Sequence, residues 1–334
     1  MSPDRAVALL AGFAGRRVAV VGDLMLDRYI FGSASRISPE APVPVVRVRE
    51  RRQALGGAAN VLHNLGGLGA TPLAYGVIGE DAPGDELLRE CADLAIDVSG
   101  IVRERGRRTI VKTRLIADHQ QVARIDEEDD VSVGTRARNE VLRKLQDGLA
   151  AGHVDAIILE DYNKGLLTTS FARRVLELAS AAGVPVALDP HPGNPLRVKG
   201  LTLMTPNRAE AFAMAGIYYR AGVLPLADDR ALLRVGATLR RRWSPEHLLV
   251  TLGGQGMALF GRLEQPFHVP TVAKEVFDVS GAGDTVIATY TLALLAGASD
   301  EEAAVIANHA AGIVVGKVGT VPIAFADLRA SLHG

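Results

Sequence analysis

Short apolar runs alternate with longer stretches of helical periodicity along nearly the whole chain. The apolar runs, which predict buried strands, cover 16–23, 72–79, 155–161, 184–190, 201–207 and 247–256. Helical spacing of apolar residues lies between them over 56–70, 84–94, 171–183 and 230–243. Such alternation is typical of a parallel sheet covered by helices on both faces. The pattern therefore predicts an α/β fold with a doubly wound, mainly parallel sheet.

Most of the predicted strands end at a polar residue or a glycine. These residues are Asp23, Asp161, Asp189, Asn207 and Gly253. In doubly wound sheets, ligands bind outside the carboxyl ends of the strands. We therefore expect the functional site along this edge of the sheet.

Two segments, 29–55 and 107–129, break the pattern. They alternate apolar and polar residues without helical spacing, and the first contains three prolines. We interpret them as antiparallel strands that form a small β-rich lid on a single domain spanning 1–334; the alternative is a pair of surface hairpins without a function. The edges of such a lid need a partner strand, so we also expect a homodimer formed through it.

Composition narrows the classes of function. The 334 residues include 37 basic and 38 acidic ones, so no global charge attracts nucleic acid or an anionic membrane. The single cysteine, Cys91, excludes a disulfide within the chain and predicts a reducing, cytoplasmic compartment. We find no signal-peptide pattern and no run of about 18 apolar residues that would predict a membrane span.

Common nucleotide- and metal-binding motifs are absent from the sequence. It has no G-x-x-x-x-G-K-[ST], no G-x-G-x-x-G after the first predicted strand and no H-x-x-x-H. These absences argue against a P-loop, a dinucleotide-binding site and a zinc site of the usual spacing. Nucleotide chemistry would need a different phosphate cradle.

The segment DVSGAGD, residues 278–284, offers such a cradle. Gly281, Ala282 and Gly283 let a phosphate approach the backbone, and a helix expected to begin near Asp284 directs free N–H groups to the same place. Such donors form an anion hole for a transferring phosphoryl group. Asp284 would then accept a proton from the attacking hydroxyl. The alternative is that Asp284 only caps the helix.

Five segments, in order, resemble the motifs of the ribokinase-like (PfkB) sugar kinase family over about residues 16–327. They are GGAANVLHNLGGLGA (56–70), GVIGEDAPGDEL (76–87), TPNRAE (205–210), VTLGGQGMALF (250–260) and DVSGAGD (278–284). The resemblance implies a ribokinase-like fold and an ATP- and Mg²⁺-dependent sugar kinase.

Three segments, 20–46, 161–168 and 281–290, resemble one bacterial branch of this family. Its members phosphorylate D-glycero-D-manno-heptose 7-phosphate at C1 in ADP-heptose synthesis, so the resemblance implies that reaction. The sequence has no H-x-G-H and ends at Gly334, which predicts the free-standing kinase without an adenylyltransferase. Gly254 and Thr289 depart from the usual residues of related chains. A kinase for another sugar and a non-catalytic sugar-binding regulator remain alternatives.

The resemblance also implies roles for single residues on the ATP side. Asp284 is the catalytic base, and the three residues before it form the anion hole. Asn207 and Glu210 organise Mg²⁺ and the phosphates through water, although their spacing also fits an ordinary capping box.

Further residues are expected around the nucleotide. Contacts with it are expected from Thr251, Gly253, Gly256 and Asn308. Asn308 could instead be a polar residue whose hydrogen bonds are satisfied between helices. Asp278 and Val279, with nearby carbonyls, are expected to hold a monovalent cation such as K⁺.

On the sugar side, carboxylates suit hydroxyl groups because these are hydrogen-bond donors. The residues expected around the sugar ring are Asp23, Asp27, Gly56, Gly57 and Asn60. Asp27 could instead form a surface ion pair with Arg28 or Arg36.

Since the chain is globally neutral, a phosphate on the acceptor must be bound by a few placed cations. The candidates are Lys112, Arg114 and Arg124 on the lid and Lys164 just past a strand end. Lys112 and Arg114 share one face of a strand, because they are two residues apart. The alternative is that the lid cations point into solvent.

Overall fold

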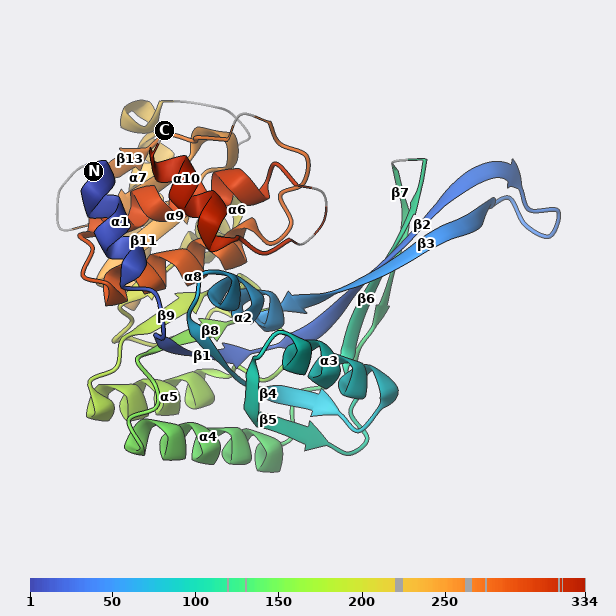
Figure 1. Cartoon of the computed structure of the whole chain (residues 1–334), viewed down its shortest axis with the longest axis horizontal. Coiled ribbons are helices and arrows are strands. Elements are labelled where there is room, and N and C mark those ends of the chain that lie inside the picture. The colour runs from blue at the N-terminus through green and yellow to red at the C-terminus, as the bar shows by residue number, and fades with distance from the viewer. Residues whose placement is uncertain are drawn as a thin grey trace.

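A nine-stranded sheet forms the centre of the molecule in the computed structural model (Figure 1). The structure describes residues 1–118, 120–129, 131–219, 225–261, 266–273, 275–317, 319 and 321–333. The strands, in spatial order, are β13 (Phe267–Val269), β12 (Met257–Phe260), β11 (His247–Thr251), β10 (Leu203–Met204), β9 (Val186–Asp189), β8 (Ala156–Glu160), β1 (Arg17–Gly22), β4 (Thr71–Gly79) and β5 (Asp97–Glu104). From β5 to β11 all neighbours pair in parallel, while β12 and β13 join in antiparallel pairs.

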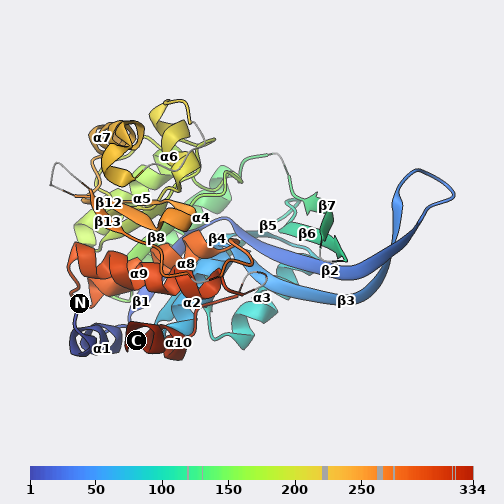
Figure 2. The ribbon, with the colours of Figure 1, turned by 90° about the horizontal axis from the view of Figure 1, so that it is seen from above.

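Helices cover both faces of this sheet (Figure 2). One face carries α1 (Pro3–Ala11), α2 (Ala58–Gly67), α3 (Ala82–Asp93), α8 (Ala282–Leu295), α9 (Asp300–Val314) and α10 (Phe325–His333). The other carries α4 (Thr135–Ala150), α5 (Thr169–Ala182), α6 (Arg208–Ala215) and α7 (Arg230–Trp243). Short 3₁₀ turns cover Leu226–Asp228 and Gly253–Gln255. The predicted doubly wound α/β fold is confirmed.

The helix sequences account for their positions. Helix α8 is apolar on nearly all sides and is almost wholly buried, as expected for a helix without a polar face. Helices α5 and α7 bury one stripe each and expose the opposite side. Cys91 on α3 is a buried core residue, and burial raises the pKa of its thiol to about 12. No helix in the described part of the chain is long and apolar enough to cross a membrane.

A second sheet of four strands projects from the α/β unit (Figure 1). Its order is β3 (Pro44–Gly57), β2 (Leu24–Ile37), β6 (Ile110–Ala117) and β7 (Gln120–Glu127). The predicted strands outside the main sheet are therefore present, and the pairs β2–β3 and β6–β7 are antiparallel as expected. The two hairpins, however, meet through β2 and β6, which are parallel. Both strands follow the carboxyl end of a parallel strand, β1 or β5, and so leave the main sheet in the same direction.

Candidate active site

Asp284 lies in the first turn of α8 and is not the helix cap. The helix begins at Ala282, and the capping position is Gly281, whose φ of 78° favours glycine and which has no side chain to cap with. The Asp284 carboxylate instead accepts hydrogen bonds from Asn60 Nδ2 (2.6 Å) and the Tyr162 hydroxyl (3.0 Å). The alternative of a capping role for Asp284 is therefore wrong, and its side chain faces the carboxyl edge of the sheet.

The surroundings of Asp284 adjust its acidity. Burial raises the pKa of its carboxyl group to about 6, while the hydrogen bonds from Asn60 and Tyr162 oppose that rise and the charge of Asp27 adds to it. A carboxylate with such a pKa is ionised at neutral pH and can still hold a proton, which suits a general base.

The N–H groups at the start of α8 have different availability. The Ala282 N–H donates to the Val279 carbonyl oxygen (3.3 Å), so this predicted donor of the anion hole already has a partner. Gly283 is the next residue, and a Cβ there would reach within 3.6 Å of Asp189 Oδ2. Its bare backbone therefore leaves room between the helix and the end of β9.

Two carboxylates beside Asp284 had no predicted role: the buried Glu160 was not named, and the partly buried Asp189 was named only as a strand end. Glu160 and Asp189 end the adjacent strands β8 and β9. One carboxylate oxygen from each of Glu160, Asp189 and Asp284 lies within 4.8 Å of the other two. Burial raises the pKa of both well above the usual range. Glu160 Oε2 is buried with no hydrogen-bond partner among the described residues. Acidic residues at the ends of neighbouring buried strands were a usable signal, but it selected Asp161 instead of Glu160 at the end of β8.

Asn207 and Glu210 form the capping box that was the alternative to a metal role. The Asn207 N–H donates to Glu210 Oε2 (2.8 Å) and the Glu210 N–H to Asn207 Oδ1 (3.0 Å) at the start of α6. Burial raises the pKa of Glu210, and its charge raises that of Asp189, so the two carboxylates lie near each other. Carboxylate oxygens at this edge are the ligand type that Mg²⁺ prefers, so the residues fit this ion.

The predicted nucleotide residues fall into two groups. Thr251 ends β11 beside Asn207, and Gly253 and Gly256 form the following turn at the same edge of the sheet. Gly256 has a φ of 86°, and a Cβ there would collide with the Val269 carbonyl oxygen.

Asn308, by contrast, is buried in α9 and donates to the Pro270 carbonyl oxygen (2.7 Å). Its amide is thus engaged within the fold, by a loop carbonyl and not between two helices, and a nucleotide contact of Asn308 stays a prediction.

The loop before α8 is held by Asp278. Its carboxylate accepts the N–H groups of Ser280 (2.9 Å) and Gly319 (3.1 Å). Val279 is 67% exposed. A cation role of these two residues stays a prediction.

The predicted sugar-side residues meet where β1, β3 and α2 join. Asp23 is buried and accepts the N–H groups of Tyr162 (3.1 Å) and Lys164 (2.9 Å). Gly56, the last residue but one of β3, lies against the Asp27 carboxylate, Gly57 caps α2, and Asn60 follows in the first turn. Burial raises the pKa of Asp23.

Two of the lid cations face the site. Lys112 and Arg114 pair across the sheet with Asp27 and Tyr29, so all four side chains lie on one face. The Lys112 ammonium lies 5.4 Å from the centre of the Tyr162 ring, which places this face toward Asp284. Asp27 forms an ion pair, as the alternative interpretation held, but its partner is Arg114 and not Arg28 or Arg36.

The other two cations are already paired. Arg124 lies opposite Arg114 on β7, but its side chain is 52% exposed and pairs with Asp126 at 2.9 Å. For Arg124 the solvent-facing alternative is favoured. Lys164 pairs with Glu128, which follows β7 at the end of the lid.

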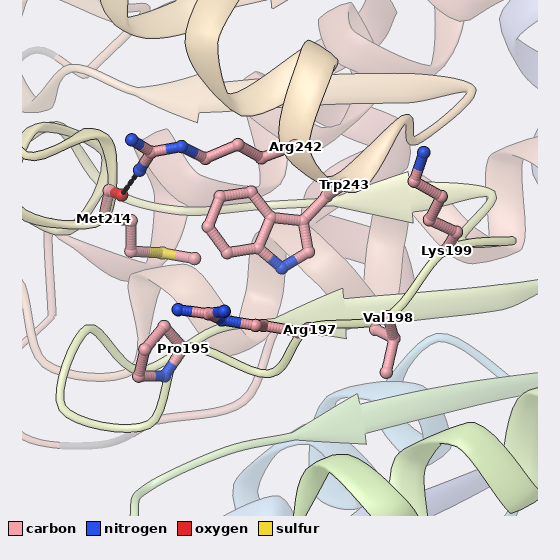
Figure 3. A pocket seen from close by; sticks show the side chains of 7 residues that line it. All are labelled: Pro195, Arg197, Val198, Lys199, Met214, Arg242 and Trp243. Atoms are coloured by element: carbon pink, nitrogen blue, oxygen red, sulfur yellow. Dashed lines mark hydrogen bonds between the residues drawn. The ribbon is translucent and has the colours of Figure 1, made fainter.

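A cavity of about 570 Å³ lies at the opposite, amino edge of the sheet (Figure 3). It is lined by Pro195, Arg197, Val198, Lys199, Met214, Arg242 and Trp243, none of which is a predicted site residue. Arg242, in the last turn of α7, donates to the Met214 carbonyl oxygen (2.8 Å) at the end of α6. A cation is favourable at helix carboxyl ends, so this charge has a structural explanation.

Comparison with known proteins decides the family. The model of the pfkB family carbohydrate kinases matches residues 16–324. The chain belongs to this family. The predicted sugar-kinase class is thereby confirmed.

Relatives and solved structures agree with this assignment. The bifunctional protein HldE of Pelobacter propionicus is 44% identical over 311 residues, which are 92% of this chain and 62% of that protein. HldE of Geobacter sulfurreducens is 42% identical over 332 residues, 98% of this chain and 66% of that protein. The chain thus spans about two-thirds of the length of these relatives.

The fold comparison includes a putative ribokinase from Agrobacterium tumefaciens, with a TM-score of 0.73 at 20% identity over 96% of this chain and 98% of that one. An Arabidopsis thaliana ribokinase complexed with ribose and ATP has a TM-score of 0.71 at 20% identity, over 96% and 99% of the two chains. At such identities the likeness concerns the fold, and it confirms the ribokinase-like architecture.

Proposed function

We propose that this pfkB-family kinase transfers the γ-phosphoryl group of ATP to C1 of D-glycero-D-manno-heptose 7-phosphate. The product would be heptose 1,7-bisphosphate, a precursor in ADP-heptose and lipopolysaccharide core synthesis. The observation that carries the proposal is the Lys112 ammonium on the inner face of the lid, which lies over the ring of Tyr162, the residue whose hydroxyl bonds the base. The resemblance of segments 20–46, 161–168 and 281–290 to heptose 7-phosphate kinases supports it.

The geometry suggests how the chain's own residues act. The Asp284 carboxylate takes the proton of the C1 hydroxyl, the sugar oxygen attacks the γ-phosphorus in line, and the bond to ADP breaks. The backbone N–H groups of Gly281 and Gly283 stabilise the charge on the transferring group, whereas the Ala282 N–H is engaged by the Val279 carbonyl oxygen. Asp23, Asp27 and Asn60 orient the sugar, and the lid over the single domain 1–334 excludes water as a competing acceptor.

Mg²⁺, placed by Glu210 and the phosphates, would supply charge neutralisation there, and Thr251 and the Gly253–Gly256 turn would hold the nucleotide. The variant Glu210→Gln keeps an oxygen that can accept the Asn207 N–H and so preserves the helix cap. We expect the Mg²⁺ concentration for half-maximal activity to rise about tenfold, because an outer-sphere carboxylate is lost, with little change in the sugar KM. A Mg²⁺ titration that matches the wild type would remove Glu210 from the metal site.

The lid would also form a homodimer. Its outer strands β3 and β7 carry apolar side chains that are largely exposed in one copy, including Val48, Val122 and Ile125. A second copy would cover these side chains and the strand edges. Light scattering at micromolar concentration should give the mass of two chains, and the mass of one chain would contradict this pairing.

The reaction itself can be tested by its product. Incubation with ATP, Mg²⁺ and heptose 7-phosphate should release one ADP per acceptor. Phosphorus NMR should then show a new phosphate coupled to the anomeric proton. ADP release without that resonance, or with a phosphate at another carbon, would contradict the proposed position of transfer.

A further inference from the structure

Behind the active site lies a buried hydrogen-bond network centred on Asn64. This residue is fully buried on α2, four residues after Asn60, so the two side chains lie on the same face of the helix. Asn64 Nδ2 donates to the Asn60 carbonyl oxygen (2.9 Å) and approaches Asn60 Oδ1 at 3.4 Å. Asn64 thus contacts both the backbone and the side chain of the residue that bonds Asp284.

The other side of Asn64 reaches the helix that carries Asp284. Asn64 Oδ1 accepts hydrogen bonds from the Thr285 hydroxyl (2.9 Å) and from the Ile323 N–H (3.0 Å). Thr285 is itself fully buried and directly follows Asp284 in the first turn of α8. One amide therefore connects α2, α8 and the segment before α10.

We propose that Asn64 and Thr285 are positioning residues that hold Asn60 in place against the base, an inference that rests on the proposed role of Asp284. Both side chains are fully buried behind Asn60 and Asp284. Asn64 approaches the Oδ1 end of the Asn60 amide, so the Nδ2 end faces Asp284. Asn60 Nδ2 donates to Asp284 Oδ2 at 2.6 Å. The bond to Thr285 fixes the start of α8 relative to α2.

The arrangement specifies one orientation because every polar atom involved is buried. Turning the Asn60 amide over would direct its oxygen at the Asp284 carboxylate, which is also an acceptor, and its nitrogen at Asn64 Nδ2, which is also a donor. Neither pair could form a hydrogen bond. Substituting Asn64 or Thr285 removes hydrogen bonds of the network that holds the Asn60 side chain in place. Asp284 and Asn60 themselves remain unchanged. Misplacement of a catalytic group by about 1 Å can cost about 100-fold in rate.

Helix α8 offers a matched pair of variants. Thr285→Val removes, at nearly constant volume, the hydroxyl that bonds Asn64 and that also lies 3.1 Å from the Gly281 carbonyl oxygen. Thr289→Val makes the same change one turn further along, at a buried hydroxyl that has no hydrogen-bond partner in the described part of the chain. We expect kcat to fall about 10- to 100-fold in Thr285→Val, with the KM for ATP unchanged, and to stay within about twofold of the wild type in Thr289→Val. Thr285→Ser should restore most of the activity.

The effect of Thr285→Val on kcat in two backgrounds distinguishes a positioning role of Thr285 from a merely structural one. In an Asp284→Asn background, adding Thr285→Val should have little further effect on kcat, because the two changes act on the same group. Equal losses in both backgrounds would overturn the proposal, and so would a full-activity Thr285→Val enzyme.

The last test does not depend on the acceptor. Crystal structures of Thr285→Val and Asn64→Leu should show Asn60 Nδ2 displaced beyond hydrogen-bond distance of Asp284 Oδ2. An unchanged contact in both would overturn the positioning role even if another sugar is the substrate, and a failure of the heptose assignment alone would leave the displacement intact. Should Asn64→Leu not fold, the Thr285→Val structure decides.

Discussion

Asp284→Asn should keep ATP binding and lose turnover by about 10²–10⁴-fold, the usual range for removal of a general base. The asparagine has nearly the same shape and keeps an oxygen for the hydrogen bond from Asn60, so the site remains assembled while the proton acceptor is gone. The measurements are kcat for sugar phosphorylation and the Kd for ATP. A variant with near-normal kcat would contradict the base assignment.

The pH dependence provides an internal control for this variant. Burial raises the pKa of Asp284 to about 6, so the carboxylate becomes protonated, and unable to accept a proton, as the pH falls through 6. Wild-type kcat/KM should therefore decrease on the acid side with a midpoint near pH 6. The residual activity of Asp284→Asn should lack this acid limb, and a limb that persists would assign the titration to another group.

Lys112→Met should raise the KM for heptose 7-phosphate about 10- to 150-fold and leave the KM for ATP unchanged. Loss of a charge-assisted contact of about 1.5–3 kcal/mol corresponds to that range. Lys112 is chosen because, among the described residues, it has no ion-pair partner, whereas Arg114, Arg124 and Lys164 are each paired with a carboxylate. Burial and, less strongly, the charge of Lys164 lower the pKa of Lys112, while the nearby carboxylates of Asp27, Glu128 and Asp126 oppose that shift.

The matched control is Arg124→Met on the same sheet. Arg124 is half exposed and bonded to Asp126, so its loss should change the acceptor KM by less than about twofold. Equal effects of the two substitutions would indicate a general electrostatic contribution of the lid. No effect of Lys112→Met would remove this residue from the acceptor site.

The sequence predicts those parts of the fold that depend on local patterns. Apolar runs and helical spacing are local, and they led to the main sheet, its two helical layers and the edge where Asp284, Asn207 and Thr251 meet. The parallel contact between β2 and β6 was not predicted, because strands from two distant segments meet there and alternation does not specify the direction of pairing.

Side-chain partners were harder to predict than the elements that carry them. Asp27 pairs with Arg114, 87 residues away, while the sequence suggested the nearby Arg28 or Arg36. Glu160 was missed because Asp161 follows it, and only the exact end of β8 decides which of the two faces Asp284. The capping box of Asn207 and Glu210 shows that a structural role and a proposed metal role can coincide in one motif.

One comparison tests the central claim most directly: the kcat/KM for heptose 7-phosphate against those for unphosphorylated heptose, ribose and hexose phosphates, measured by ADP release with the same enzyme. The proposed acceptor should exceed unphosphorylated heptose at least about tenfold, because only the phosphate can use the Lys112 contact. Equal kcat/KM values for heptose 7-phosphate and for unphosphorylated heptose or ribose would contradict the heptose assignment.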